Sequence, residues 1–302
     1  MNEGGQFSRE ARTAAVVFFV LLGMTLVPPF TLLTAWLLPV PLIVFWRLGH
    51  RRAAMVLTGI VALALWAGGM GLAGVFMALG VGFVSYVMAE SMRTVESPFA
   101  AIITGALVFI MMELVVLALI RWSGIDIFDA LVHDLEDSLR QQQGMMGLDD
   151  AAVRTLAADV AQWIRLMFPS VISVVSVLLA GVNLVAARWL LRHRIAPKPL
   201  LSAVRLPSSV VLVYVLALAA VLLGWPKEIP FGWQLVNNAA FLAGFFLGVQ
   251  GVAFLWRRVR GRTGQHLWLV LMLAGSLLRP VSSIYIVLGV IDVMNHSRRR
   301  LG

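Results

Sequence analysis

The sequence contains no cysteine and few charged residues. The absence of cysteine excludes disulfide bonds, thiolate catalysis and cysteine-ligated metal sites within this chain. Charged side chains make up only 13% of the 302 residues, whereas soluble domains carry about 25%. The chain therefore has too little polar surface to face water along its whole length.

The sequence also lacks the motifs of several enzyme classes. It has no GxxxxGK[ST] nucleotide-binding loop, no HExxH zinc motif and no GxSxG nucleophile motif. The five histidines are scattered, mostly in loops beside arginine, and we interpret them as solvated residues. His133, which has acidic neighbours on its predicted helix, is either such a solvated residue or a ligand of a cation. We expect no catalytic residues, no bound metal and no cofactor, and therefore a protein that is not an enzyme.

Long apolar runs fill most of the chain. Hydrophobic residues make up 60% of the sequence, and the runs approach the roughly 20 residues that a helix needs to cross a bilayer. The alternating pattern of a membrane barrel is missing, and helices satisfy their own backbone groups in lipid. We predict an all-α integral membrane protein, a polytopic helical bundle of eight clear transmembrane helices plus a broken or kinked C-terminal segment. The eight spans are expected at residues 13–27, 30–46, 52–67, 71–90, 98–120, 167–191, 207–224 and 234–256.

The net charge of +9 is concentrated in short segments between these predicted spans. With the N-terminus in the cytoplasm, most of the 24 basic residues fall on the cytoplasmic side, as the positive-inside rule requires. Tryptophans fall near the predicted edges of the spans, where their amphipathic rings are favoured. The pattern indicates a bacterial cell (inner) membrane protein whose partner is the lipid bilayer and not nucleic acid.

The last apolar segment, residues 267–293, permits two topologies. A single helix over residues 267–291 would be about 37 Å long, but it would bury Arg279 near the bilayer centre. Two short helices broken at Arg279 and Pro280 would return the Arg298–Arg300 cluster to the cytoplasm, although each half is short for the hydrocarbon layer. We favour the broken pair.

The one long loop, residues 122–166, is net acidic and is predicted to lie outside the cell. Its apolar residues repeat at helical spacing in two stretches, which predicts two amphipathic helices over the bundle or on the membrane surface. Asp126 is the expected N-cap of the first helix, and Asp149 and Asp150 favour the N-terminus of the second. The two helices form either a cover that seals the bundle or a substrate lid.

Ionisable residues inside the spans are candidates for a functional site, because each is costly in lipid unless it is paired or hydrated. Glu113 and Arg279 are predicted at similar depths, and we expect them to approach each other as a structural ion pair or as a substrate or proton site. Gln250 is an uncharged polar candidate that either bonds between helices or binds a ligand. Gly244 and Gly248 form a GxxxG pair that favours internal packing or dimerisation.

Four short stretches carry a resemblance to a known family. They are "FPSVISVVSVLLAGVNLVAARWLLRHR", the "RLP" that follows it, "VQG", and "LGVIDVMNHSRR" near the end. Together they resemble the YybS-type family of predicted bacterial membrane proteins of unknown function. The residues that match its pattern are Pro169, Asn183, Arg188, Arg205, Leu206, Pro207, Gly289, Asp292 and Arg298. Asn183 and Asp292 are the further candidates for ligand binding, while Asn295 and Ser297 replace an Asp and a Phe of that pattern.

The N-terminal part is also similar to the substrate-binding S components of energy-coupling-factor vitamin transporters. "LPVPLIVFWRLGHRRA" carries this similarity, with Pro39, Pro41, Arg47 and Gly49 in comparable places. It implies a six-helix S-component-like core over residues 1–191, including the loop 122–166, and a C-terminal helical extension over 192–302. It also implies an energy-coupling subunit or another membrane protein as a possible partner.

Two functions from different classes follow from these observations. The first is a small-molecule-binding, transport-related membrane protein that has no ATPase of its own and whose ligand the sequence does not name. The alternative is a non-transporting membrane scaffold or regulatory protein that acts through its basic cytoplasmic loops.

The predicted topology can be tested by labelling intact cells. Because the chain has no cysteine, a Ser138→Cys variant carries a single thiol within the acidic loop. An impermeant thiol reagent is expected to label this variant in intact cells, and to label a Ser202→Cys variant only after lysis. The reverse pattern would overturn the predicted orientation.

Overall fold

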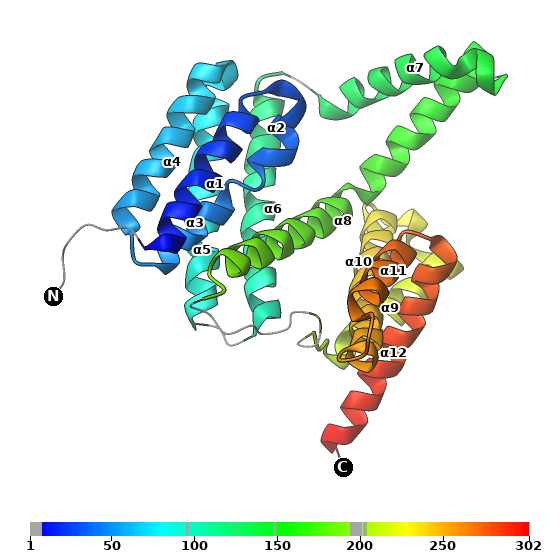
Figure 1. Cartoon of the computed structure of the whole chain (residues 1–302). Helices are drawn as coiled ribbons and strands as arrows, with labels where there is room; N and C mark the ends of the chain where they lie inside the picture. Colours follow the sequence, from blue (N-terminus) through cyan, green and yellow to red (C-terminus); the bar gives the residue numbers. More distant parts are fainter. Residues whose placement is uncertain are drawn as a thin grey trace. The chain divides into compact units, whose positions relative to one another are not determined.

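Every regular element in the described part of the protein is a helix. The computed structural model describes residues 8–94, 97–124, 126–147, 149–193, 201 and 204–301, and these ranges contain no strand (Figure 1). Large apolar side chains on the helices are exposed, for example Leu72 (74%) and Leu223 (80%), as expected of surfaces that face lipid. The prediction of an all-helical membrane protein is confirmed at this level.

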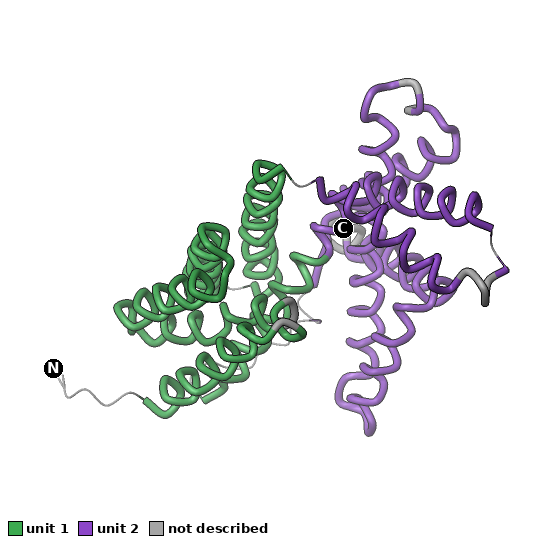
Figure 2. Tube along the Cα trace, turned by 90° about the horizontal axis from the view of Figure 1, so that it is seen from above, with its two compact units in different colours: residues 1–125, 175–198 green, residues 126–174, 199–302 purple. Residues whose placement is uncertain are grey.

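The chain divides into two compact units (Figure 2). One contains residues 1–125 and 175–198, and the other contains residues 126–174 and 199–302. The predicted S-component-like core includes the acidic loop, whereas residues 126–174 belong to the second compact unit. The predicted domain boundary at residue 191 rests on the family resemblance and stays a prediction.

The first unit begins with short helices and continues with long ones. Its helices are α1 (Arg9–Thr25), α2 (Pro28–Ala35), α3 (Pro39–Arg47), α4 (Arg51–Leu65), α5 (Gly71–Thr94), α6 (Pro98–Trp122) and the part of α8 (Asp150–Leu190) that follows Val174. Proline opens α2 and α3, because the first turn of a helix does not use the N–H that proline lacks. The predicted span 30–46 is therefore two short helices.

A kink joins α4 to α5. A π-helical turn, Trp66–Met70, continues the helix, while Gly69 (φ 93°) and Gly71 (φ 54°) adopt positive φ values that suit glycine. The predicted break between residues 67 and 71 lies at this point. The two predicted spans on either side of it nevertheless belong to one bent helical segment of 44 residues.

The predicted count of eight clear transmembrane helices is not supported. The predicted spans 13–27, 30–46 and 207–224 form helices of 8 to 17 residues, shorter than the roughly 20 needed to cross a bilayer. The bent pair α11–α12 is a candidate for a further crossing. The helical segments that are long and apolar enough in the described residues are these four: Arg51–Thr94, Pro98–Trp122, Asp150–Leu190 and Gly232–Val259.

The second unit combines the acidic segment with the C-terminal helices. Asp126 caps the helix of the acidic segment, as predicted. Its carboxylate accepts hydrogen bonds from the N–H groups of Phe128 (2.9 Å) and Asp129 (3.3 Å). Asp149 caps α8 in the same way through the N–H of Ala152 (2.7 Å). The elements of this unit are α7 (Ile127–Met146), α8 up to Val174, α9 (Ser208–Leu223), the 3-10 turn η3 (Trp225–Glu228), α10 (Gly232–Val259), α11 (Gln265–Ser276) and α12 (Arg279–Leu301).

Helix α8 runs through Pro169 without ending there, which corrects the prediction of a separate amphipathic helix followed by a span at 167–191. Proline cannot donate to the carbonyl of Arg165 four residues earlier, so this carbonyl needs another donor. Gln234 Nε2 of α10 provides it (3.5 Å). The Asn238 side chain accepts from the N–H of Ser170 (2.8 Å) and donates to the carbonyl of Leu166 (2.7 Å). Side chains from α10 therefore bond the interrupted backbone of α8.

The C-terminal apolar segment is broken where the sequence predicts. Helix α11 ends at Ser276, α12 begins at Arg279, and the two are bent by 109°. The residues after Gly289 lie beside the C-terminal part of α10, since Asp292 is ion-paired with Arg257. The chain thus returns to the end of the unit from which α11 departs, and this favours the broken pair over a single span.

Two glycines allow α10 and α12 to cross with their backbones in contact. A Cβ atom added at Gly251 would overlap the carbonyl group of Tyr285, and one added at Gly289 would overlap that of Leu247. Gly248, in contrast, has nothing closer than an atom of Ile286 at 3.9 Å. Close packing at this crossing therefore requires glycine at 251 and 289 but not at 248.

Alanine substitutions are expected to distinguish Gly289, which is in close backbone contact, from Gly248, which has room for a side chain. Gly289→Ala should lower the free energy of unfolding by about 1–3 kcal/mol, because the helices must move apart. The matched control, Gly248→Ala, should stay within about 1 kcal/mol of the wild type, because alanine favours helix and finds room. Denaturant titration in detergent micelles measures both values, and equal effects would contradict the proposed crossing.

Candidate functional site

Three of the short sequence motifs meet around Asp292. Its carboxylate accepts hydrogen bonds from Gln250 Nε2 and from Arg257 Nη2 of α10. Gln250 Oε1 accepts the N–H of Leu206 (3.3 Å), which ties the segment before α9 to α10. The structure thus brings together two of the predicted ligand-binding candidates, Gln250 and Asp292.

Helical spacing explains why these side chains converge. Gln250 and Arg257 lie seven residues apart, which is two turns along one face of α10. Asp292 and His296 lie four residues apart on one face of α12. The crossing at the two glycines brings these faces together. His296 Nε2 lies 3.3 Å from Arg205 Nη1, so the predicted motif residue Arg205 reaches the same cluster.

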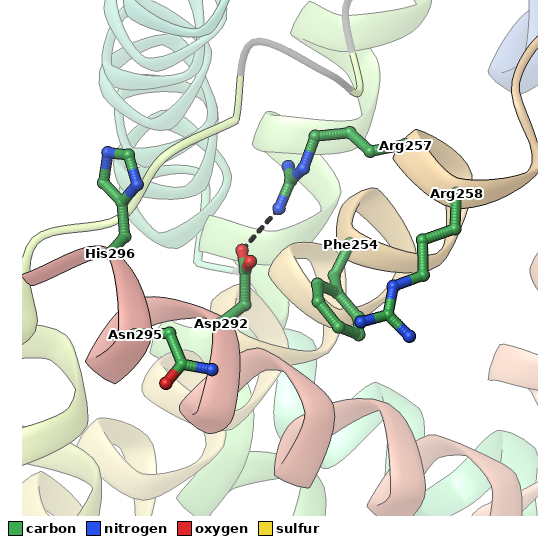
Figure 3. Close-up of a pocket in the computed structure, with 6 residues that line it drawn as sticks. All are labelled: Phe254, Arg257, Arg258, Asp292, Asn295 and His296. Atoms are coloured by element: carbon green, nitrogen blue, oxygen red, sulfur yellow. Dashed lines mark hydrogen bonds and ion pairs between the residues drawn. The ribbon is translucent and has the colours of Figure 1, made fainter. Parts of the chain in front are cut away.

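A cavity with a volume of ≈ 320 Å³ opens beside this network (Figure 3). The guanidinium of Arg257 points toward Asp292, while Arg258 lies over the ring of Phe254, with its Cζ atom 4.3 Å from the ring centre. The cavity is lined from α10 by Phe254, Arg257 and Arg258, and from α12 by Asp292, Asn295 and His296.

The lining of this cavity carries more positive than negative charge. Among the described residues that line it, Asp292 is the acidic one, and it is already paired with Arg257. The Nη1 atom of Arg257 is buried and has no hydrogen-bond partner among the described residues. A buried guanidinium nitrogen without an acceptor is costly, so an anion or another acceptor would be favoured here.

No group of three or more His, Cys, Asp or Glu residues that could hold a metal occurs in the described ranges.

Two ligand candidates and one motif residue lie in the first unit. Glu113 of α6 accepts a hydrogen bond from the hydroxyl of Ser176 (2.9 Å) on α8. Two turns further along α8, Asn183 is fully buried, and its Nδ2 donates to the carbonyl of Trp36 (2.9 Å). Arg188 lies in the last turn of α8. Glu113 and Asn183 thus bond segments within the first unit, and the ligand-binding role of these two residues stays a prediction.

The predicted pair of Glu113 and Arg279 involves residues of different units. Glu113 has Ser176 as its hydrogen-bond partner, and Arg279 is exposed at the start of α12, where its carbonyl accepts the hydroxyl of Ser282 (2.8 Å). The pairing stays a prediction.

The remaining motif residues have local structural roles. Pro207 precedes α9 as its N-cap. Gly244 of α10 faces α9, because a Cβ atom added at this glycine would lie 3.2 Å from the ring of Tyr214.

The sequence pattern does not mark Arg257, Arg258 and His296 as residues of one cavity. The two arginines belong to the basic residues on the predicted cytoplasmic side, and His296 is one of the five scattered histidines. The seven-residue spacing of Gln250 and Arg257 is a signal that links a polar candidate to a cation on the same helix face. The other residues of the cavity come together only because of how α10 packs against α12, and the sequence does not show this packing.

A family model described as "Predicted membrane protein (DUF2232)" matches residues 14–293. No curated protein and no solved structure matches the chain. This family match does not test the resemblance to the YybS-type family or the S-component-like core. Both stay hypotheses.

The ion pair at the centre of the site can be measured by a double-mutant cycle. Arg257→Ala, Asp292→Ala and the double variant are expected to give a coupling energy of about 1–2 kcal/mol, because both side chains are largely buried. The matched control is the pair of Arg140 and Glu136 on α7, 3.0 Å apart, which should give about 0.5 kcal/mol or less. A coupling at the central pair that does not exceed the control would contradict its proposed role.

Proposed function

The chain belongs to this family of predicted membrane proteins, and on that premise we propose that it binds a small anionic molecule as part of a transport-related role. The binding site is the cavity at the crossing of α10 and α12. The observation that carries the proposal is the Arg257 guanidinium, which has one nitrogen on Asp292 and another without a partner among the described residues.

The charge of the lining supports an anionic ligand. Arg258 adds a second guanidinium, and His296 also lines this cavity. Arginine recognises carboxylate and phosphate groups by paired, charge-assisted hydrogen bonds. Because Asp292 neutralises only one of the two arginines, an incoming anion would find an uncompensated cation.

The rigidity and size of the cavity support a specific site. Asp292 and Gln250 fix the orientation of Arg257, so little side-chain freedom is lost when a ligand binds. The volume of ≈ 320 Å³ lies at the lower end of small-molecule sites. A compound of the size of a small phosphate ester or a short carboxylic acid fits this range.

The membrane placement is part of the proposal. We place the protein in a bacterial inner membrane with its N-terminus in the cytoplasm, where the positive-inside rule also puts the basic end of α10. The chain carries no nucleotide-binding loop, so uptake against a gradient would need a partner, such as an energy-coupling subunit. The S-component-like core and the need for that partner are hypotheses of the same proposal.

Anion binding can be tested on the purified full-length chain. Inorganic phosphate and citrate are expected to raise the unfolding temperature in a saturable way, whereas choline chloride at equal ionic strength should not. Arg258→Gln should weaken the apparent affinity by about tenfold, because one charge-assisted contact is lost. The matched control is Arg262→Gln, which removes the same charge outside this cavity and should leave the affinity unchanged.

Either of two outcomes would reject the proposal. One is the absence of saturable stabilisation by any anion. The other is an equal loss of affinity in the Arg258→Gln and Arg262→Gln variants, which would indicate a general charge effect.

A further inference from the structure

The second unit contains another cavity, of ≈ 400 Å³, at the opposite end of α10. Trp233, which lines it, and Arg257 of the anion cavity are 24 residues apart on one helix, a rise of about 36 Å. The two cavities are therefore separate. The residues that line this second one are Asp159, Gln162, Trp163, Arg165 and Leu166 of α8, and Trp233 and Gln234 of α10.

The α8 wall of this cavity is a single helical stripe. Asp159, Gln162, Trp163 and Leu166 follow one another at three- and four-residue spacing, so their side chains share one face. The stripe is held against the first turn of α10, because Gln234 donates to the carbonyl of Arg165, four residues before Pro169. The same bonds that compensate for the proline thus fix the two walls of the cavity.

The chemistry of the lining combines flat apolar surfaces with groups that bond to hydroxyls. Trp163 is 54% exposed, and an exposed indole offers a flat face on which an apolar surface can stack. The carboxylate of Asp159 accepts hydrogen bonds, whereas the amides of Gln162 and Gln234 both donate and accept. Hydroxyl groups also donate and accept, so they match this set.

The charges of the lining favour a neutral ligand. Among the described residues that line the cavity, Asp159 and Arg165 carry opposite charges that balance each other. The ammonium of Lys227 already lies 5.1 Å from the ring centre of Trp233, which disfavours a second cation at that indole. This distinguishes the cavity from the arginine-lined one.

From these observations we infer that the cavity between α8 and the start of α10 binds a neutral sugar ring. The ring stacks a C–H face on Trp163 and directs its hydroxyls to Asp159 and to the glutamine amides. With the topology proposed above, the cavity opens on the outer side of the membrane. The inference does not depend on anion binding at the other end of α10.

Saturation-transfer difference NMR on the full-length chain tests this inference. The protein is kept in a detergent without a sugar headgroup, and glucose, N-acetylglucosamine and maltose are the probes. At least one sugar should bind saturably, and Trp163→Ala or Asp159→Asn should each weaken its Kd by about tenfold. Trp268→Ala is the matched control, because it removes an exposed indole of the same unit that does not line this cavity.

Thermal unfolding of each variant shows whether it is folded, and Gln162→Ala provides a third cavity variant, at a residue that is exposed. Sugar binding that is lost in the cavity variants but kept in Trp268→Ala supports the inference. It is overturned if none of the three sugars binds, if the cavity variants bind as well as the wild type, or if choline or phosphate competes for the same site.

Discussion

Backbone and polar groups away from water must find partners within the protein, and α10 supplies them to the rest of the second unit. At its first turns, Gln234 and Asn238 bond the groups that Pro169 leaves without partners in α8. Towards its end, Gln250 bonds both the segment before α9 and the carboxylate of α12. Side-chain amides of α10 thus bond neighbouring segments at two positions along this helix. Each candidate cavity lies next to one of these two positions.

Amide side chains suit this task because they offer a donor and an acceptor without a charge. Asn238 uses both functions on α8, since its side chain accepts the N–H of Ser170 and donates to the carbonyl of Leu166. The largely buried carboxylate of Asp292 has Arg257 as its partner, and the additional bond from Gln250 offsets part of the cost of removing this pair from water.

Local signals predicted much of the fold. The cap at Asp126, the break at Gly69 and the break before Arg279 each follow from the chemistry of one or two residues. The continuity of α8 through Pro169 could not be predicted, because the compensating donors lie about 70 residues further along the chain. The span count was wrong because hydropathy measures composition and not helix length. Gln250 and Asp292 were identified singly, but their contact depends on the helix crossing. The pairing of Glu113 with Arg279 was predicted only from their similar depth in the membrane, and it stays a prediction.

At Gly251 and Gly289 the main chains of α10 and α12 are in direct contact. This close approach does not involve Phe254, Asn295 or His296, which line the arginine-lined cavity. Homologous chains could exchange Phe254, Asn295 or His296 without losing the helix crossing, provided that both glycines are kept. Such a crossing lets ligand preference diverge while the architecture is inherited unchanged.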